Sequence, residues 1–81
     1  MSKIIIECKV PAAGVVCDMS IPYEMPLLVT LELMKAAFEG QEGIFLDADT
    51  VLCDSKTGSI FNIEMTPEEA KLENGSSLSL V

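Results

Sequence analysis

The strongest constraint on the fold is a two-residue alternation of side chains in the first 21 residues. It runs from Lys3 to Val10 and resumes from Val15 to Ile21. Alternation of this kind is typical of β-strands, because successive side chains point to opposite faces of a sheet. Residues 11–14, Pro-Ala-Ala-Gly, separate the two runs and indicate a tight turn. The sequence therefore predicts a β-hairpin whose inner face carries Ile4, Ile6, Cys8, Val10, Val15, Cys17, Met19 and Ile21.

After the hairpin, the spacing of apolar residues changes to that of an α-helix. Pro22 and Pro26 lack an amide donor and cannot continue a strand ladder. The next apolar residues recur at i, i+4, i+7 and i+11, which places them on one side of a helix, and they are Leu27, Leu31, Met34 and Phe38. Gly40 is expected to end this helix, which is then about twelve residues long.

The C-terminal half predicts short elements joined by turns. Residues 41–49 are expected to form a loop that places Ile44, Phe45 and Leu46 on the core. A third strand is expected from Thr50 to Asp54 and a brief fourth strand from Ser59 to Asn62.

A capped turn and a last strand follow. Thr66, Pro67 and Glu69 have the spacing of a helix-capping box, in which Thr and Glu each bond to the other's backbone N–H. Asn74-Gly75 ends this turn, and Leu78 and Leu80 alternate with serines in a final strand.

The order of these elements favours one α+β domain covering residues 1–81. The connection that contains the helix allows the last strand to pair in parallel with the first. The compact arrangement is a β-grasp, a mixed sheet with strand order 2-1-5-3 and one helix packed across it. The alternative is a two-layer sandwich in which the first and last strands are not neighbours.

Charge and composition exclude several classes of function. The chain has 5 Lys and no Arg against 13 Asp plus Glu, which gives a net charge of −8. It therefore lacks the basic surface that nucleic-acid binding requires, and a protein partner with a basic face is favoured instead. No apolar stretch is long enough to insert into a membrane, and Lys3 to Glu7 does not resemble a secretory signal. A cytoplasmic protein is expected, and three cysteines fit its reducing environment.

Neither catalysis nor cofactor binding is expected from the residue types present. Without His, the usual Cys or Ser nucleophile has no base beside it. Cys8, Cys17 and Cys53 are too widely spaced for an iron–sulfur loop and are interpreted as buried, inert thiols. Asp47 and Asp49 do not match a calcium loop, because Val51 stands where a third oxygen ligand is needed. We therefore expect no enzyme and assign no catalytic, cofactor or metal residue.

Several segments resemble the ubiquitin-like superfamily, and within it most closely the YukD/EsaB family of type VII secretion accessory proteins. The resemblance covers nearly the whole chain and rests on the opening hairpin, the helix from Leu27 to Glu39, and three tail segments, residues 51–58, 66–70 and 72–80. It implies a non-enzymatic, cytoplasmic accessory or regulator of type VII (WXG100/ESX-like) secretion. Ubiquitin and the sulfur carriers end in Gly-Gly, whereas this sequence ends Leu-Ser-Leu-Val, so neither conjugation nor sulfur carriage is expected. A small sulfur-carrier-like protein and a homodimeric structural subunit are the alternatives.

Two surfaces are candidates for contact with a partner or a second copy. On the helix, Val29, Leu33 and Ala36 widen the apolar arc beyond what one sheet needs, unless the loop at 41–49 covers them. On the sheet face away from the helix, Ile5 and Val81, joined by Leu52 or its neighbours on the adjacent strand, are expected to form a small apolar patch, which the superfamily resemblance implies as a docking site. Single exposed apolar residues without any function are the alternative.

Overall fold

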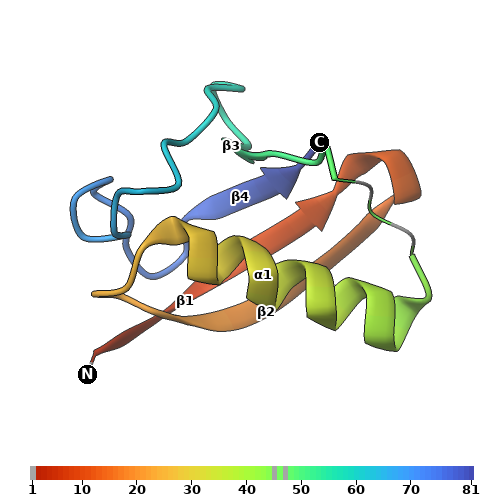
Figure 1. Cartoon of the computed structure of the whole chain (residues 1–81), viewed down its shortest axis with the longest axis horizontal. Helices are drawn as coiled ribbons and strands as arrows, with labels where there is room; N and C mark the ends of the chain where they lie inside the picture. Colours follow the sequence, from red (N-terminus) through yellow and green to blue (C-terminus); the bar gives the residue numbers. More distant parts are fainter. Residues whose placement is uncertain (1, 45, 47) are drawn as a thin grey trace.

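The computed structural model describes residues 2–44, 46 and 48–81 and, for residues 41 and 42, the backbone alone. Its elements are β1 (Lys3–Val10), β2 (Val15–Pro22), α1 (Leu27–Ala37), β3 (Leu52–Asp54) and β4 (Ser77–Leu80), with a 3₁₀ turn at Pro11–Ala13 and a π-helical turn at Phe38–Glu42. The four strands form one sheet, and α1 lies across one of its faces (Figure 1).

The predicted hairpin is confirmed. β1 and β2 pair antiparallel over their whole length, from Lys3 opposite Pro22 to Val10 opposite Val15. Gly14 closes the turn between them with a φ of 68°, a left-handed conformation that glycine adopts without steric cost. Since one face of this hairpin must meet the core, the alternation of the sequence determines its register.

The sheet has the order β2-β1-β4-β3, with β4 parallel to β1 and antiparallel to β3. This is the β-grasp order 2-1-5-3 predicted from the sequence, in which the last strand, here β4, was counted as the fifth. The sandwich alternative is wrong because the first and last strands are neighbours. The brief strand predicted from Ser59 to Asn62 is also wrong. Only an isolated bridge between Ile60 and Cys53 forms there.

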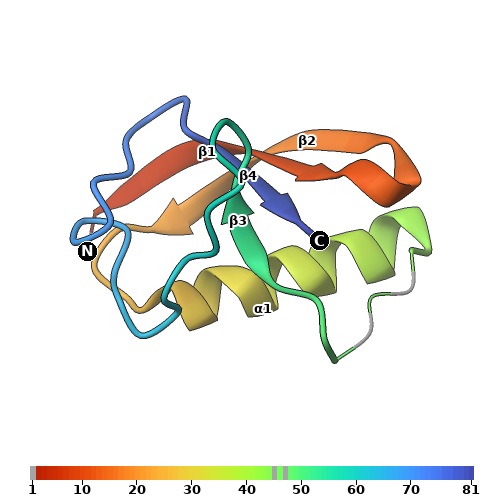
Figure 2. The same cartoon turned by 90° about the horizontal axis from the view of Figure 1, so that it is seen from above.

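After this bridge the chain leaves the sheet and runs to the start of α1, where its carbonyls accept hydrogen bonds from the first N–H groups of the helix. The carbonyls of Ile63 and Met65 accept hydrogen bonds from the N–H groups of Leu28 and Leu27, at 2.9 and 2.7 Å. A helix start has unpaired N–H groups that need such acceptors. The segment after residue 60 therefore caps the helix instead of continuing the strand predicted from Ser59 to Asn62 (Figure 2).

Helical backbone continues beyond the predicted end of the helix. Gly40 does not stop it, because the chain continues from Ala37 into the π-helical turn at Phe38–Glu42. Gly43 ends this turn with a φ of 65°, and its N–H donates to the Phe38 carbonyl. The left-handed residue that ends a helix is commonly Gly, and here it lies three positions beyond the one expected.

One apolar core lies between the sheet and α1. The predicted helix face supplies Leu27, Leu31, Met34 and Phe38, and all four are buried. The sheet contributes its inner rows and the C-terminal turn adds one leucine, so the other buried members are Ile6, Cys8, Val10, Ile21, Leu52, Leu72, Leu78 and Leu80. Ile44 and Leu46 pack against this core, as expected of the loop. Phe45 lies outside the described residues.

The capping box near residue 66 is confirmed. The Thr66 N–H donates to Glu69 Oε1 at 2.9 Å, and the Glu69 N–H donates to Thr66 Oγ1 at 3.1 Å. The backbone N–H of each residue is thereby satisfied by the side chain of the other. The turn also positions Leu72, which is 6% exposed, against the core.

Thr30 is a polar residue on the buried side of α1. Its side chain is fully buried, and Oγ1 has no hydrogen-bond partner among the described residues. Replacing Thr30 with Val keeps the branched shape and removes the desolvated hydroxyl, so the free energy of unfolding is expected to rise by about 1 kcal/mol. Urea denaturation measures this change. Thr57→Val is the control at an exposed position; it removes the acceptor of the Ser59 N–H and is expected to lower stability, not raise it. A Thr30→Val protein that is less stable than the parent would contradict the prediction.

Candidate protein-interaction surfaces

The sheet face opposite α1 does not hold the apolar patch predicted for it. Ile5 and Val81 are exposed at 55% and 58%, as expected, but Leu52 is fully buried. Leu52 pairs with Leu80, and both side chains point into the core. Its neighbour Cys53 alternates to the other face, and it is only 5% exposed. Leu52 is therefore a core residue and not part of a docking site.

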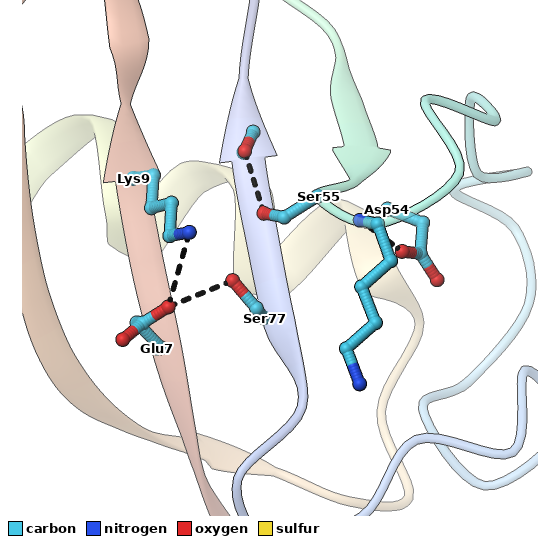
Figure 3. Close-up of polar contacts among 7 residues, drawn as sticks. Glu7, Lys9, Asp54, Ser55 and Ser77 are labelled. Carbon is cyan, nitrogen blue, oxygen red and sulfur yellow. Dashed lines mark hydrogen bonds and ion pairs between the residues drawn. The ribbon is translucent and has the colours of Figure 1, made fainter.

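A polar network crosses the middle of this open face. Glu7 Oε1 accepts a hydrogen bond from the Ser77 hydroxyl at 2.9 Å and lies 3.4 Å from Lys9 Nζ (Figure 3). The hydroxyls of Ser79 in β4 and Ser55, the residue after β3, are 2.6 Å apart. The network joins β1 to β4 and β4 to the residue after β3.

This network separates the apolar residues at the two ends of the open face. Ile5 lies opposite Ser20, whereas exposed Val16 lies opposite Lys9, four residues further along β1. At about 3.3 Å per residue, those two rows are about 13 Å apart, and Glu7 and Asp18 form the row between them. Lys9 also pairs with Ser79, so Val81 lies two residues beyond the Val16 row, still further from Ile5. Ile5 and Val81 are therefore two isolated exposed side chains, which is common on protein surfaces.

Glu7 gives this network a pH dependence. The hydrogen bond from Ser77 and then the interaction with Lys9 lower the pKa of Glu7 below its ordinary value of 4.5. A carboxylate whose pKa is depressed in the folded state stabilises the fold above its unfolded pKa, and this contribution is lost as the pH falls through the folded value. Glu7→Gln is therefore expected to lose less stability than the parent below about pH 4.5. Urea unfolding as a function of pH measures this loss of stability. Ser77→Ala removes the hydrogen bond to Glu7 and is also expected to lose less stability at low pH than the parent. Superimposable pH curves for the parent and Glu7→Gln would contradict the assignment.

The outer face of α1 presents apolar side chains beside acidic ones. Leu28 and Leu33 are 46% and 42% exposed. Ala36 is also exposed, while Val29 is only partly so. The described part of the loop does not cover Leu33 or Ala36. Two exposed glutamates, Glu32 and Glu39, lie on the same outer surface.

Of the predicted contact residues, α1 therefore brings together Val29, Leu33 and Ala36, whereas Ile5, Leu52 and Val81 are not brought together. Exposed Leu28, Val16 and Ile60 were not predicted. Leu28 directly follows buried Leu27, and at 100° per residue it lies at the edge of the buried face of the helix. The spacing of apolar residues does not indicate whether such an edge residue is buried or exposed.

The described residues contain few groups that could perform chemistry. No cluster of three or more His, Cys, Asp or Glu among them could hold a metal ion. Burial raises the pKa of the Cys8 thiol to about 12, so this cysteine stays protonated at neutral pH. In the part of the chain that is described, no helix has the length and apolar character to span a bilayer.

Two shallow hollows lie on the described surface. The larger, of about 340 Å³, lies at one end of the sheet and is lined by residues that include Val10, Ala12 and Leu80. The smaller, of about 150 Å³, lies near the C-terminal turn and includes Lys56, Lys71 and Asp54. The smaller hollow also includes Ser77, whose hydroxyl donates to Glu7 in the contact that joins β1 to β4. We take the exposed face of α1 as the better candidate for a functional surface.

Comparison with known proteins identifies the fold. No protein-family model and no curated protein matches the sequence. Among solved structures, one chain of the toluene 4-monooxygenase HD complex with the inhibitor 4-bromobenzoate is similar with a TM-score of 0.84 and 11% identity, over 99% of this chain and 98% of that chain. The ubiquitin-like domain of the Mycobacterium tuberculosis type VII secretion system protein EccD1 has a TM-score of 0.72 and 15% identity, over 100% and 99% of the two chains. Caldiarchaeum subterraneum ubiquitin has a TM-score of 0.75 and 15% identity, over 98% and 91%. At these identities the likeness concerns architecture, and the chain has the ubiquitin-like fold.

Proposed function

We propose that this chain is a non-enzymatic, ubiquitin-like interaction module that acts in the cytoplasm as an accessory or regulator of a type VII secretion apparatus. The exposed apolar and acidic outer face of α1 carries the proposal. Similarity to the ubiquitin-like domain of EccD1 supports the secretion context. The same fold also occurs in a chain of a monooxygenase complex and in ubiquitin, so the likeness agrees with the secretion context without selecting it.

The outer face of α1 suits protein binding better than the open face of the sheet. Helices that only face water usually carry polar side chains there, whereas Leu28 and Leu33 each remain more than 40% exposed. At 100° per residue, Leu33 lies together with Val29 and Ala36, and Glu32 lies along one edge of this apolar group. Apolar side chains bordered by charged ones are common at interfaces. The open face of the sheet lacks such a group, because the Glu7 network divides it.

The charge of the chain favours a partner with a basic surface. Glu32 and Glu39 lie beside the apolar residues on the outer side of α1, and the whole chain carries −8. A second copy carries the same charge, so self-association through this face is opposed by repulsion, whereas a basic partner is attracted. Binding is therefore expected to weaken as the salt concentration rises.

Binding to the isolated membrane complex of a type VII secretion apparatus, from cells that express this chain, tests the proposal. Leu33→Asp is expected to weaken binding at least about tenfold, or about 1.4 kcal/mol, because a charge replaces an apolar contact. Ile5→Asp is the matched control, since Ile5 is similarly exposed on the opposite face of the molecule, and it retains the parent's affinity. Circular dichroism checks that both variants are folded.

The outcomes separate the two parts of the proposal. Loss of binding in Ile5→Asp with full binding in Leu33→Asp would overturn the choice of the helix face. Failure of the parent to bind the complex would overturn the secretion role. Sedimentation of a dimer that Leu33→Asp dissociates would establish the homodimeric alternative instead.

A further inference from the structure

Cys8 and Cys17 lie directly opposite each other on neighbouring strands. The register of β1 and β2 pairs Cys8 with Cys17, so both side chains project from the same face of the sheet. Cys8 is fully buried, and Cys17 is partly buried against the same core. All three cysteines of the chain are described, and none is in a disulfide.

The backbone hydrogen bonds identify the type of this pair. The Ile5 carbonyl and the Glu7 N–H bond towards β4, to Gly75 and Ser76. The even-numbered residues of β1 therefore bond towards β2, and the bond from the Tyr23 N–H to the Ser2 carbonyl has the same phase. Cys8 and Cys17 are thus a hydrogen-bonded pair, for which the Cα atoms are about 5.5 Å apart.

This spacing is within reach of a disulfide. Disulfide-linked residues have Cα separations of roughly 4.4 to 6.8 Å and Cβ separations of about 3.5 to 4.5 Å. Directly opposite Cβ atoms in a sheet are about 4.5 to 5.5 Å apart, with hydrogen-bonded pairs at the long end, so the two must approach by about 1 to 2 Å. β2 can make this movement because it is an edge strand with β1 as its one neighbour in the sheet. A bond formed under such strain is readily reduced again.

We infer that Cys8 and Cys17 form a reversible oxidation site, which closes to a cross-strand disulfide in exchange with a low-molecular-weight disulfide such as oxidised glutathione. The Cys17 thiolate attacks one sulfur of the small disulfide, forms a mixed disulfide and releases one small thiolate. The Cys8 sulfur then loses its proton and attacks the Cys17 sulfur, which releases the second small thiolate. The protein loses two protons and two electrons, and one small disulfide becomes two thiols.

The surroundings of the two sulfurs assign this order of attack. Burial, and then Cys17, Asp18 and Glu7, raise the pKa of Cys8, so Cys8 is a poor first nucleophile. Cys17 is the more accessible of the pair and lies on the edge strand. Cys53 takes no part. It alternates with core residue Leu52 and so projects from the opposite face of the sheet.

The positions of the lysines make the test direct. Trypsin cleavage at lysine places the three cysteines on separate peptides, 4–9, 10–35 and 36–56. The folded full chain is equilibrated with oxidised glutathione, quenched with acid, digested and analysed by mass spectrometry. The expected product links peptides 4–9 and 10–35 and disappears on addition of reduced dithiothreitol.

Three variants and one control condition complete the experiment. Cys53→Ser is expected to form the same linked product as the parent, whereas Cys17→Ser forms none. Cys8→Ala is expected to stop at a glutathione adduct on Cys17. The chain unfolded in guanidinium chloride provides the reference, since all pairings become accessible there. A native product that contains Cys53, or a parent that accumulates the Cys17 adduct without closing the bond, would overturn the inference.

Discussion

Replacing Phe38 with Ala is expected to lower the free energy of unfolding by about 3 to 5 kcal/mol. Phe38 is 1% exposed and is among the largest fully buried side chains of the core. A domain of 81 residues has a total stability of roughly 4 to 12 kcal/mol. The substitution therefore removes a large share of what holds the fold together.

Chemical denaturation followed by circular dichroism measures this loss. Leu33→Ala is the matched control, because Leu33 belongs to the same helical segment but is 42% exposed. It is expected to change stability by less than about 0.5 kcal/mol. Equal losses in the two variants would mean that the helix does not face the sheet as described.

Leu52→Asp is expected to prevent stable folding, whereas Ile5→Asp is tolerated. Leu52 is fully buried opposite Leu80, and an aspartate there has no basic residue among the core members to pair with it. Burying an unpaired carboxylate costs several kcal/mol, comparable to the whole stability of a domain this small. Ile5 is 55% exposed on the open face, and a charge there remains in water, so its cost is below about 1 kcal/mol.

Thermal melts and amide NMR spectra of the two variants distinguish these outcomes. The Ile5→Asp spectrum is expected to keep its dispersion, and that of Leu52→Asp to collapse. A folded Leu52→Asp protein would return Leu52 to the surface and restore the open-face patch predicted from the sequence.

The elements with a clear period were predictable from the sequence. The alternation from Lys3 to Ile21 predicts the hairpin, and the spacing of Leu27, Leu31, Met34 and Phe38 predicts the helix and its buried side. Both patterns act over short distances along the chain. The central position of the last strand followed from the length of the connection between strands and was also correct.

The errors arose where long-range contacts decide the structure. Residues 59–62 have the composition of a strand, yet the segment that follows is held by the helix start through Ile63 and Met65. In β3, Leu52 and Cys53 are adjacent and both apolar, so alternation alone does not indicate which one faces the core. Glu7 and Ser77 are 70 residues apart, and no local pattern relates them. The polar network that divides the open face was therefore invisible in the sequence.

The parallel pairing of β1 with β4 affects how this chain matures on the ribosome. The hairpin and α1 are synthesised early, but their inner neighbour β4 begins only at Ser77. At typical synthesis rates, the intervening residues take on the order of seconds. During that interval the hairpin and helix carry apolar surfaces that the finished sheet will cover, and the repulsion between acidic chains opposes their premature association.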